Sequence, residues 1–178
     1  MAELLPVGVR RDGSYYTRVE WASVTEKNPC FWVCNLISDD HERNGGTYGA
    51  NTIDTADVIL SFWGETQTLG KIRIFKNVGV TISVVEELAR KINIYVSTTD
   101  DPAKIRTDAD KITDCEWNLV KSIDIVKEFG WQEAVLDTPV EAKYVRIELV
   151  GNFCRLAENG QPGIPWCECS EVKLYPAE

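Results

Sequence analysis

The chain has 178 residues, with 19 Lys and Arg against 28 Asp and Glu, and a formal net charge of −9 at pH 7. This length suits one domain with a sizeable core, and a hydrophobic fraction of 44% is typical of a folded protein. The acidic balance argues against a protein that binds nucleic-acid phosphates. The sequence contains no run of the roughly 20 apolar residues that a membrane span needs.

Short segments with alternating apolar residues dominate the predicted elements. In the first of them Val58, Leu60 and Phe62 share one face, as expected for a half-buried strand. In chain order the predicted strands are 58–62, 71–75, 91–97, a weaker one at 131–136, 144–150 and 171–175. Weak helical signals lie at 84–90 and 108–113. Such strands predict an all-β fold, an antiparallel sandwich of two sheets.

Long loops separate these strands at 25–52, 76–90, 99–116 and 151–169. The last of them carries several turn residues, including Pro162-Gly163 and Pro165. No repeat or linker interrupts the chain, so we expect a single domain over 1–178, with residues 1–18 as a leading strand or arm. Loops on a rigid sandwich are the usual place for binding residues.

The single histidine, His41, restricts the chemistry open to this chain. Nucleophilic triads, zinc hydrolysis and most general-base schemes draw on histidine. Against this stand six tryptophans, six tyrosines and five phenylalanines. Many aromatic residues with few catalytic bases indicate a module that binds a ligand by stacking and is not an enzyme.

Six cysteines leave three alternatives open. An even number fits disulfides in an extracellular protein, with Cys30 and Cys34 stapling Phe31-Trp32-Val33, and Cys154 reaching Cys167 or Cys169. All six are free thiols in the second alternative, which suits a reducing compartment. In the third, Cys30, Cys34, Cys167 and Cys169 bind zinc, although their spacing is not that of a zinc ribbon.

Five segments in order resemble the discoidin, or coagulation factor type C, superfamily. They are Asn35 to Asp40, similar to the family's "N-x-I-D-G-D" loop; the hairpin VILSFWGETQTLGKIRIF at 58–75; Ile92 to Ser97 with the following Trp117; KYVRIEL at 143–149; and SEVKLY at 170–175. The resemblance covers roughly residues 20–175. It implies a galactose-binding-like jelly roll with long loops at one end, used by bacterial carbohydrate-binding modules, lectins, and domains that bind phospholipid or protein.

Two departures from the family pattern stand out. The family's T-x-W-H after the aspartate loop is absent, since residues 44–51 read NGGTYGAN. No histidine therefore aligns with the family's usual contact to an axial sugar hydroxyl. The loop at 99–116 is also longer and more acidic than the family's pattern.

The resemblance also implies a structural Ca²⁺ between the aspartate loop and the start of the last strand. Carried over by position, its ligands are the side chains of Asp39, Asn44 and Glu171 and the backbone carbonyls of Leu36, His41 and Ser170, with Asp40 in reserve for Asp39. Such mixed oxygen ligation suits Ca²⁺, although Na⁺ remains an alternative. Otherwise Asp39-Asp40 is a solvated turn and Glu171 an edge charge.

The loops at one end of the implied fold form a ligand surface from segments 30–34, 41–51, 76–80 and 152–168. A sugar ring packs its apolar C–H face on an aromatic side chain, and its hydroxyls need polar partners beside it. The residues that we expect there are Trp166, Trp32, Phe31, Tyr48, Lys76, Asn77, Arg43, His41 and Asn51.

Each aromatic residue also has a structural interpretation. Trp166 either contacts ligand or packs its own loop, Phe31-Trp32 either forms an exposed tip or plugs the bottom of the sandwich, and His41 is otherwise an ordinary loop residue. Four tryptophans lie in or beside predicted strands and are expected in the core: Trp21, Trp63, Trp117 and Trp131.

These features predict a non-catalytic carbohydrate-binding module with a structural Ca²⁺ nearby. The alternative is a discoidin-type adhesion module that binds a protein, or less readily a phospholipid, through the Phe31-Trp32 loop. We expect the partner to be a glycan or polysaccharide. The chain is expected to be a monomeric, extracellular part of a larger secreted protein, although its first residues, MAELLPVGVRRDG, show no signal peptide.

Overall fold

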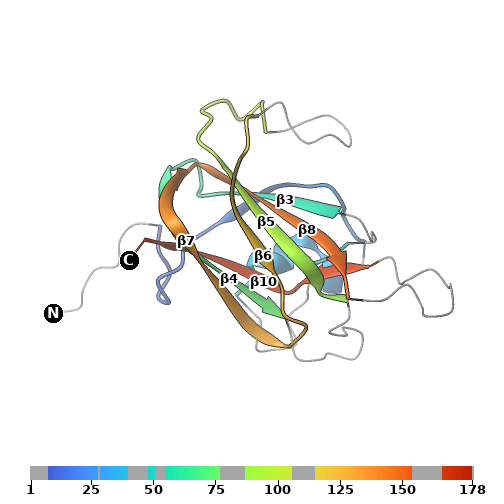
Figure 1. The fold of residues 1–178 in the computed structure, drawn as a ribbon. Coiled ribbons are helices and arrows are strands. Elements are labelled where there is room, and N and C mark those ends of the chain that lie inside the picture. Colours follow the sequence, from blue (N-terminus) through green and yellow to red (C-terminus); the bar gives the residue numbers. More distant parts are fainter. Residues whose placement is uncertain are drawn as a thin grey trace, which may run out of the picture.

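Alternation of apolar and polar residues along the strands produces two antiparallel sheets packed face to face in the computed structural model (Figure 1). The structure describes residues 8–27, 29–39, 48–50, 55–76, 87–105, 115–153 and 166–177. Every pairing between its named strands is antiparallel. The all-β sandwich expected from the sequence is therefore confirmed.

The larger sheet has five strands in the order β1-β3-β8-β5-β6. These strands are β1 (Arg18–Ala22), β3 (Thr55–Ser61), β8 (Tyr144–Asn152), β5 (Ala89–Ser97) and β6 (Asn118–Asp124). β8 lies at the centre, pairing with β3 on one side and with β5 on the other.

The smaller sheet has three strands in the order β10-β4-β7, namely β10 (Glu171–Pro176), β4 (Gln67–Lys76) and β7 (Gly130–Ala142). A two-stranded ribbon joins β2 (Tyr48–Ala50) to β9 (Cys167–Cys169). Two short 3₁₀ helices, η1 (Pro29–Phe31) and η2 (Val33–Ile37), precede β2.

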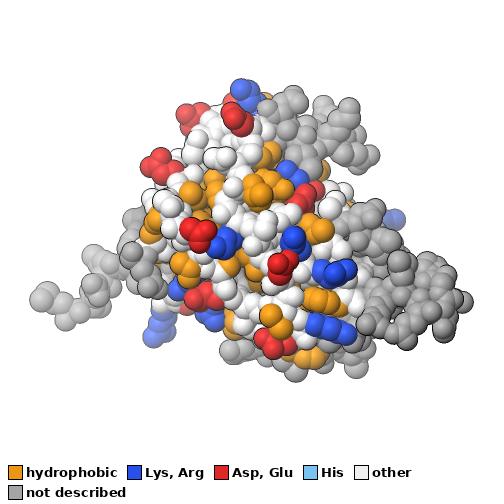
Figure 2. Space-filling model, in the orientation of Figure 1, with side chains coloured by type: hydrophobic (Ala, Val, Ile, Leu, Met, Phe, Trp, Pro, Cys, Tyr) orange, Lys and Arg blue, Asp and Glu red, His pale blue; other side chains and the backbone are white. Residues whose placement is uncertain are grey.

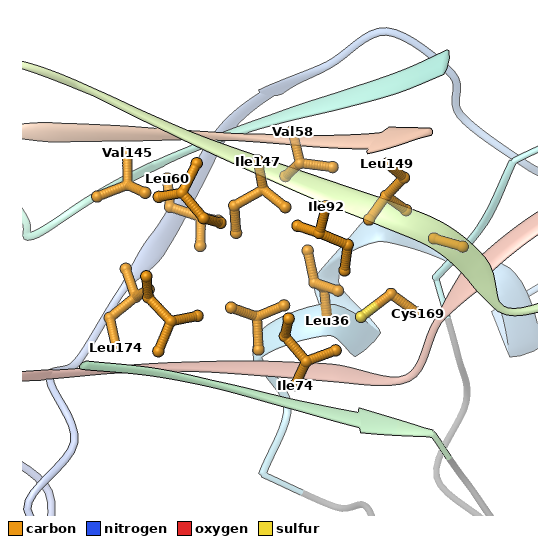
Figure 3. Close-up of a cluster of buried hydrophobic side chains, with 14 of the residues drawn as sticks. Leu36, Val58, Leu60, Ile74, Ile92, Val145, Ile147, Leu149, Cys169 and Leu174 are labelled. Carbon is orange, nitrogen blue, oxygen red and sulfur yellow. The ribbon is translucent and has the colours of Figure 1, made fainter. Parts of the chain in front are cut away.

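The core lies between the two sheets and is closed at one end by η2 and β9 (Figure 3). The large sheet contributes aliphatic side chains that point toward Ile74 and Leu174 of the small sheet, and Leu36 and Cys169 lie at the closed end. The labelled residues of the large sheet are Val58, Leu60, Ile92, Val145, Ile147 and Leu149.

A second apolar cluster contains Ile59 and Tyr144 of the large sheet together with Ile105 and Cys115. Since Val58 and Leu60 belong to the main core, the intervening Ile59 points to the opposite face of its sheet. Trp21 and Trp117 pack against this cluster and are only partly buried, so they cover the outside of the sandwich.

The expectation that four tryptophans lie in the core is wrong, because Trp21, Trp117 and Trp131 are only partly buried and Trp63 is 64% exposed. β3 ends at Ser61, so Trp63 falls in the turn to β4. Trp131 is partly buried, with its ring centroid 4.9 Å from that of Phe75.

The six predicted strands are present, and the sequence did not predict β1, β2, β6 and β9 as strands. The helical signal at 84–90 is wrong at its end, because Ala89 and Arg90 begin β5. The helical signal at 108–113 lies outside the described residues, and so do large parts of the four predicted long loops.

Four described cysteines, Cys34, Cys115, Cys167 and Cys169, are free thiols. Because Cys34 is free, the predicted staple from Cys30 is not formed. Cys154 lies outside the described residues, and both of its predicted partners, Cys167 and Cys169, are free. The thiols of Cys167 and Cys169 lie in the core, where Cys167 donates a hydrogen bond to the Gly151 carbonyl at 3.1 Å. Burial raises the pKa of Cys167 to about 12, helped by the nearby Glu168, so this thiol stays protonated and unreactive.

Charges of both signs are interspersed with small apolar areas on the face shown in Figure 2. The acidic excess therefore does not gather into one large acidic patch on this face.

Within the described residues, no helix is long and apolar enough to cross a membrane.

Candidate ligand-binding site

Trp166 is held in a fixed position beside the β2–β9 ribbon. Its indole nitrogen donates a hydrogen bond to Oε1 of Glu168 at 2.7 Å, and its carbonyl oxygen accepts one from the side-chain amide of Asn152. The ring of Phe31 meets the indole edge-on, with centroids 4.9 Å apart. Because these contacts hold the indole while it remains partly exposed, it forms a rigid aromatic surface.

Gly49 allows this close packing. A Cβ atom at Gly49 would lie 2.4 Å from Cζ2 of Trp166, which is too close for van der Waals contact, and 3.0 Å from Cδ1 of Phe31, which is tight. Gly49 pairs with Glu168 across the ribbon. The ribbon backbone therefore forms the floor on which both aromatic rings lie.

A buried ion pair lies beneath Trp166. Nζ of Lys76, at the end of β4, donates a hydrogen bond to Oε2 of Glu168 at 2.5 Å, and both side chains have no exposed surface. The other carboxylate oxygen of Glu168 accepts the indole hydrogen bond. One carboxylate thus links the core end of β4 to the aromatic surface, and charge neutralisation by Lys76 offsets its burial.

Trp32 follows Phe31 in the chain, in the link between η1 and η2. It is 46% exposed, and its carbonyl oxygen accepts a hydrogen bond from the backbone of Asn35 at 3.0 Å. The neighbouring Phe31 packs on Trp166 instead of pointing into solvent. The structure therefore joins Phe31 and Trp166 and leaves Trp32, the next residue in the chain after Phe31, exposed.

Two predicted ligand contacts are buried and so correct the sequence prediction. Tyr48 has no exposed surface, and its hydroxyl donates a hydrogen bond to the Val24 carbonyl at 3.0 Å. Burial raises the pKa of this hydroxyl well above its usual value. Lys76 is 1% exposed and bound to Glu168. The remaining predicted contacts, Arg43, His41, Asn51 and Asn77, lie outside the described residues.

Glu168 and Gly49 are site residues that the sequence analysis missed. Trp166 and Glu168 are two positions apart beside and within β9, so strand geometry places both side chains on one face. That spacing is a signal from which Glu168 could be found. Gly49 carries no such signal, because its role depends on Trp166, which joins it only in the folded ribbon.

The predicted cation ligands meet at one ammonium group. Nζ of Lys173 lies 2.6 Å from Oδ1 of Asp39 and 3.7 Å from Oε1 of Glu171, and Arg10 lies 3.6 Å from Asp39. Asp39 has a φ of 62° and a half-exposed side chain, whereas Glu171 is 1% exposed. The structure therefore gathers the two predicted carboxylates, with Asp39 already engaged by two cations.

Lys173 also binds Asp12. Burial alone raises the pKa of Asp12, but hydrogen bonds from Lys173 and Ser14 outweigh it and lower this pKa to about 2. Leu36 is fully buried and Ser170 nearly so, while Asn44 and His41 lie outside the described residues. In the described part of the chain no group of three or more His, Cys, Asp or Glu is placed to hold a metal ion.

A buried carboxylate such as that of Glu171 is chemically suited to a cation with oxygen ligands. Asp39 fits such an ion less well, because Lys173 and Arg10 already neutralise it. Lys173 also lies 3.7 Å from Oε1 of Glu171, so both predicted carboxylates already face a cation.

No family model matches this chain, and no curated protein matches it in sequence. Solved structures do match it in fold. One is the family 32 carbohydrate-binding module of Streptococcus pneumoniae EndoD, with a TM-score of 0.62 at 15% identity, covering 90% of this chain and 95% of that one.

Two other matches come from Clostridium perfringens. The family 32 module of NanJ, solved in complex with galactose, has a TM-score of 0.60 at 9% identity, over 89% of this chain and 92% of that one. The third family 32 module of a family 31 glycoside hydrolase has a TM-score of 0.64 at 10% identity, over 90% of both chains. The chain therefore has the fold of these family 32 modules, the galactose-binding-like β-sandwich that its motifs predicted.

Proposed function

We propose that this chain is a non-catalytic carbohydrate-binding module, whose sugar stacks on Trp166 with Trp32 beside it. The observation that carries the proposal is the fixed, partly exposed indole of Trp166, held by Glu168, Phe31 and the floor at Gly49. A preorganised aromatic surface loses little conformational entropy when a sugar ring packs on it. The family 32 modules that share the fold support the same interpretation.

The test is a glycan array probed with the unmodified chain and with Trp166→Ala. We expect selective glycan binding, and a loss of at least about tenfold in affinity for the variant, since stacking on an aromatic ring contributes about 1.4 kcal/mol or more. Tyr16→Ala is the matched control, because Tyr16 is also an exposed aromatic residue, at 52%. Its place in the fold differs from that of Trp166, since the hydroxyl of the neighbouring Tyr15 donates a hydrogen bond to the Thr68 carbonyl at the start of β4. Equal binding by Trp166→Ala would remove Trp166 from the site.

A second candidate function rests on the exposure of Trp32. A single exposed tryptophan beside a rigid platform is a suitable anchor for a protein partner. This adhesion role predicts silence across the array, together with a protein partner whose binding is lost in Trp32→Ala. Glycan binding that survives Trp32→Ala but not Trp166→Ala would contradict it.

We also propose that Ca²⁺ binds at the corner formed by Glu171 and the segment after η2. The buried carboxylate of Glu171 supports this proposal. The role that we propose for the ion is to hold the segment after η2 against β10. The setting that we propose for the module is extracellular, as part of a larger glycan-directed protein.

A further inference from the structure

The turn between β3 and β4 holds a tryptophan in a backbone conformation that suits glycine or asparagine. Trp63 has a φ of 59° and Gly64 a φ of 93°, and the backbone nitrogen of Glu65 donates to the Phe62 carbonyl at 3.2 Å. Positive φ at both central residues defines a type I′ hairpin turn, for which Asn-Gly is the preferred pair. A bulky residue there is unfavourable, and such strain is found most often at functional positions.

The side chain of Trp63 is exposed but not loose. The guanidinium carbon of Arg18 lies 5.7 Å from the centre of the indole ring, and Arg18 is 3.6 Å from Oε1 of Glu20. The same carboxylate oxygen accepts a hydrogen bond from the Ser61 hydroxyl at 2.6 Å. This chain of contacts fixes Arg18 over the ring, while 64% of Trp63 remains exposed.

Trp63 lies at the end of the sandwich opposite Trp166. Along the pair β3–β8, Thr55 is opposite Val150 and Ser61 is opposite Tyr144. Asn152, just beyond Val150, contacts Trp166, whereas Trp63 follows Ser61. The length of β3 therefore separates the two aromatic surfaces, and one ligand ring cannot contact both.

We propose that Trp63 is a second saccharide-binding platform, in which a sugar ring stacks on the indole and Arg18 donates hydrogen bonds to its hydroxyl or carboxylate oxygens. The side chain of Arg18 is 49% exposed, so it keeps donors for a ligand after pairing with Glu20. A ring with an apolar C–H face and polar edges matches an indole flanked by a guanidinium. The saccharide class rests on the proposed function, but the platform is built from residues separate from the first site.

The experiment follows the indole N–H signals of the six tryptophans by NMR, assigned with single Trp→Phe variants. Galactose, N-acetylgalactosamine and glucuronic acid are titrated separately into the unmodified chain and into Trp166→Ala. We expect the Trp63 signal to shift and saturate with at least one sugar, and to do so equally in Trp166→Ala. The control Trp63→Asn should raise the unfolding temperature by about 3 °C, since it relieves the strained turn.

A Trp63 signal that stays unchanged with all three sugars overturns the second platform, whatever the Trp166 signal does. A shift at Trp166 alone leaves the proposed function intact and rejects this inference. A shift at Trp63 alone supports the second platform and rejects the first. Sugar binding by Trp63→Asn that matches the unmodified chain in stoichiometry also contradicts the proposal.

Discussion

Lys76 shows how a residue that a family pattern assigns to the ligand becomes part of the support beneath it. Its ammonium has no exposed surface and reaches Glu168 instead of solvent. The partner lies far along the chain, so nothing near Lys76 in the sequence signals the pairing. Trp166 was predicted from its loop position and does lie at a partly exposed site, but the hydrogen bond that fixes it comes from an unpredicted residue.

Replacement of Lys76 by Met is expected to destabilise the fold by about 3–5 kcal/mol, because it leaves the Glu168 carboxylate buried without its counter-charge. Urea denaturation measures this change in the free energy of unfolding. The double variant Lys76→Met with Glu168→Gln should recover much of the loss, since an amide oxygen can still accept the indole hydrogen bond of Trp166. A loss below about 1 kcal/mol for Lys76→Met would show that the pair is not truly buried.

At the scale of elements, strands with clear alternation were predictable and short or edge strands were not. β4, β5 and β8 show alternation because one face of each strand packs into the core. β6 lies at the sheet edge with Leu119 exposed, so its pattern is weak. β2 and β9 have only three residues each and exist because they pair with one another, which single-segment reasoning cannot reveal.

The β2–β9 ribbon gives a direct test of the site geometry. Gly49→Ala places a methyl group where the indole of Trp166 now lies, so the ring must move. We expect a loss of sugar affinity comparable with that of Trp166→Ala, together with a changed near-ultraviolet circular dichroism spectrum. Ala50→Gly in the same strand is the matched control, since it removes a methyl group without a clash. Unchanged affinity in Gly49→Ala would mean that ligand binding does not depend on the position of Trp166.

For the whole molecule, strand alternation correctly predicted the all-β sandwich, but the composition did not predict the arrangement of charge. The formal charge of −9 includes carboxylates that are neutralised locally, such as Glu168 by Lys76 and Asp57 by Arg146. These pairs join residues of different strands, so the sequence alone cannot match them. The exposure of the Trp63 side chain likewise depends on the residue at which β3 ends.

Calcium is expected to act on the stability of the whole molecule. If Glu171 contributes to a structural site, removal of the ion with EDTA should lower the unfolding temperature, and added Ca²⁺ should restore it in proportion to the logarithm of its concentration. Glu171→Gln should abolish this response, whereas Asp124→Asn, an exposed carboxylate on β6, should retain it. Differential scanning calorimetry of all three proteins checks the expectation, and an unfolding temperature independent of both Ca²⁺ and EDTA would contradict it.

The ribbon also affects the order in which the protein folds. β2 and β9 come from opposite halves of the chain, so their pairing closes a very long loop. Closing this loop costs conformational entropy, so the pairing is expected to form more slowly than the β3–β4 hairpin. We therefore expect the floor under Trp166 to assemble later than the β3–β4 hairpin. Binding competence should appear after most of the secondary structure has formed, so a refolding chain passes through a stage that has its sheets but cannot yet hold its ligand.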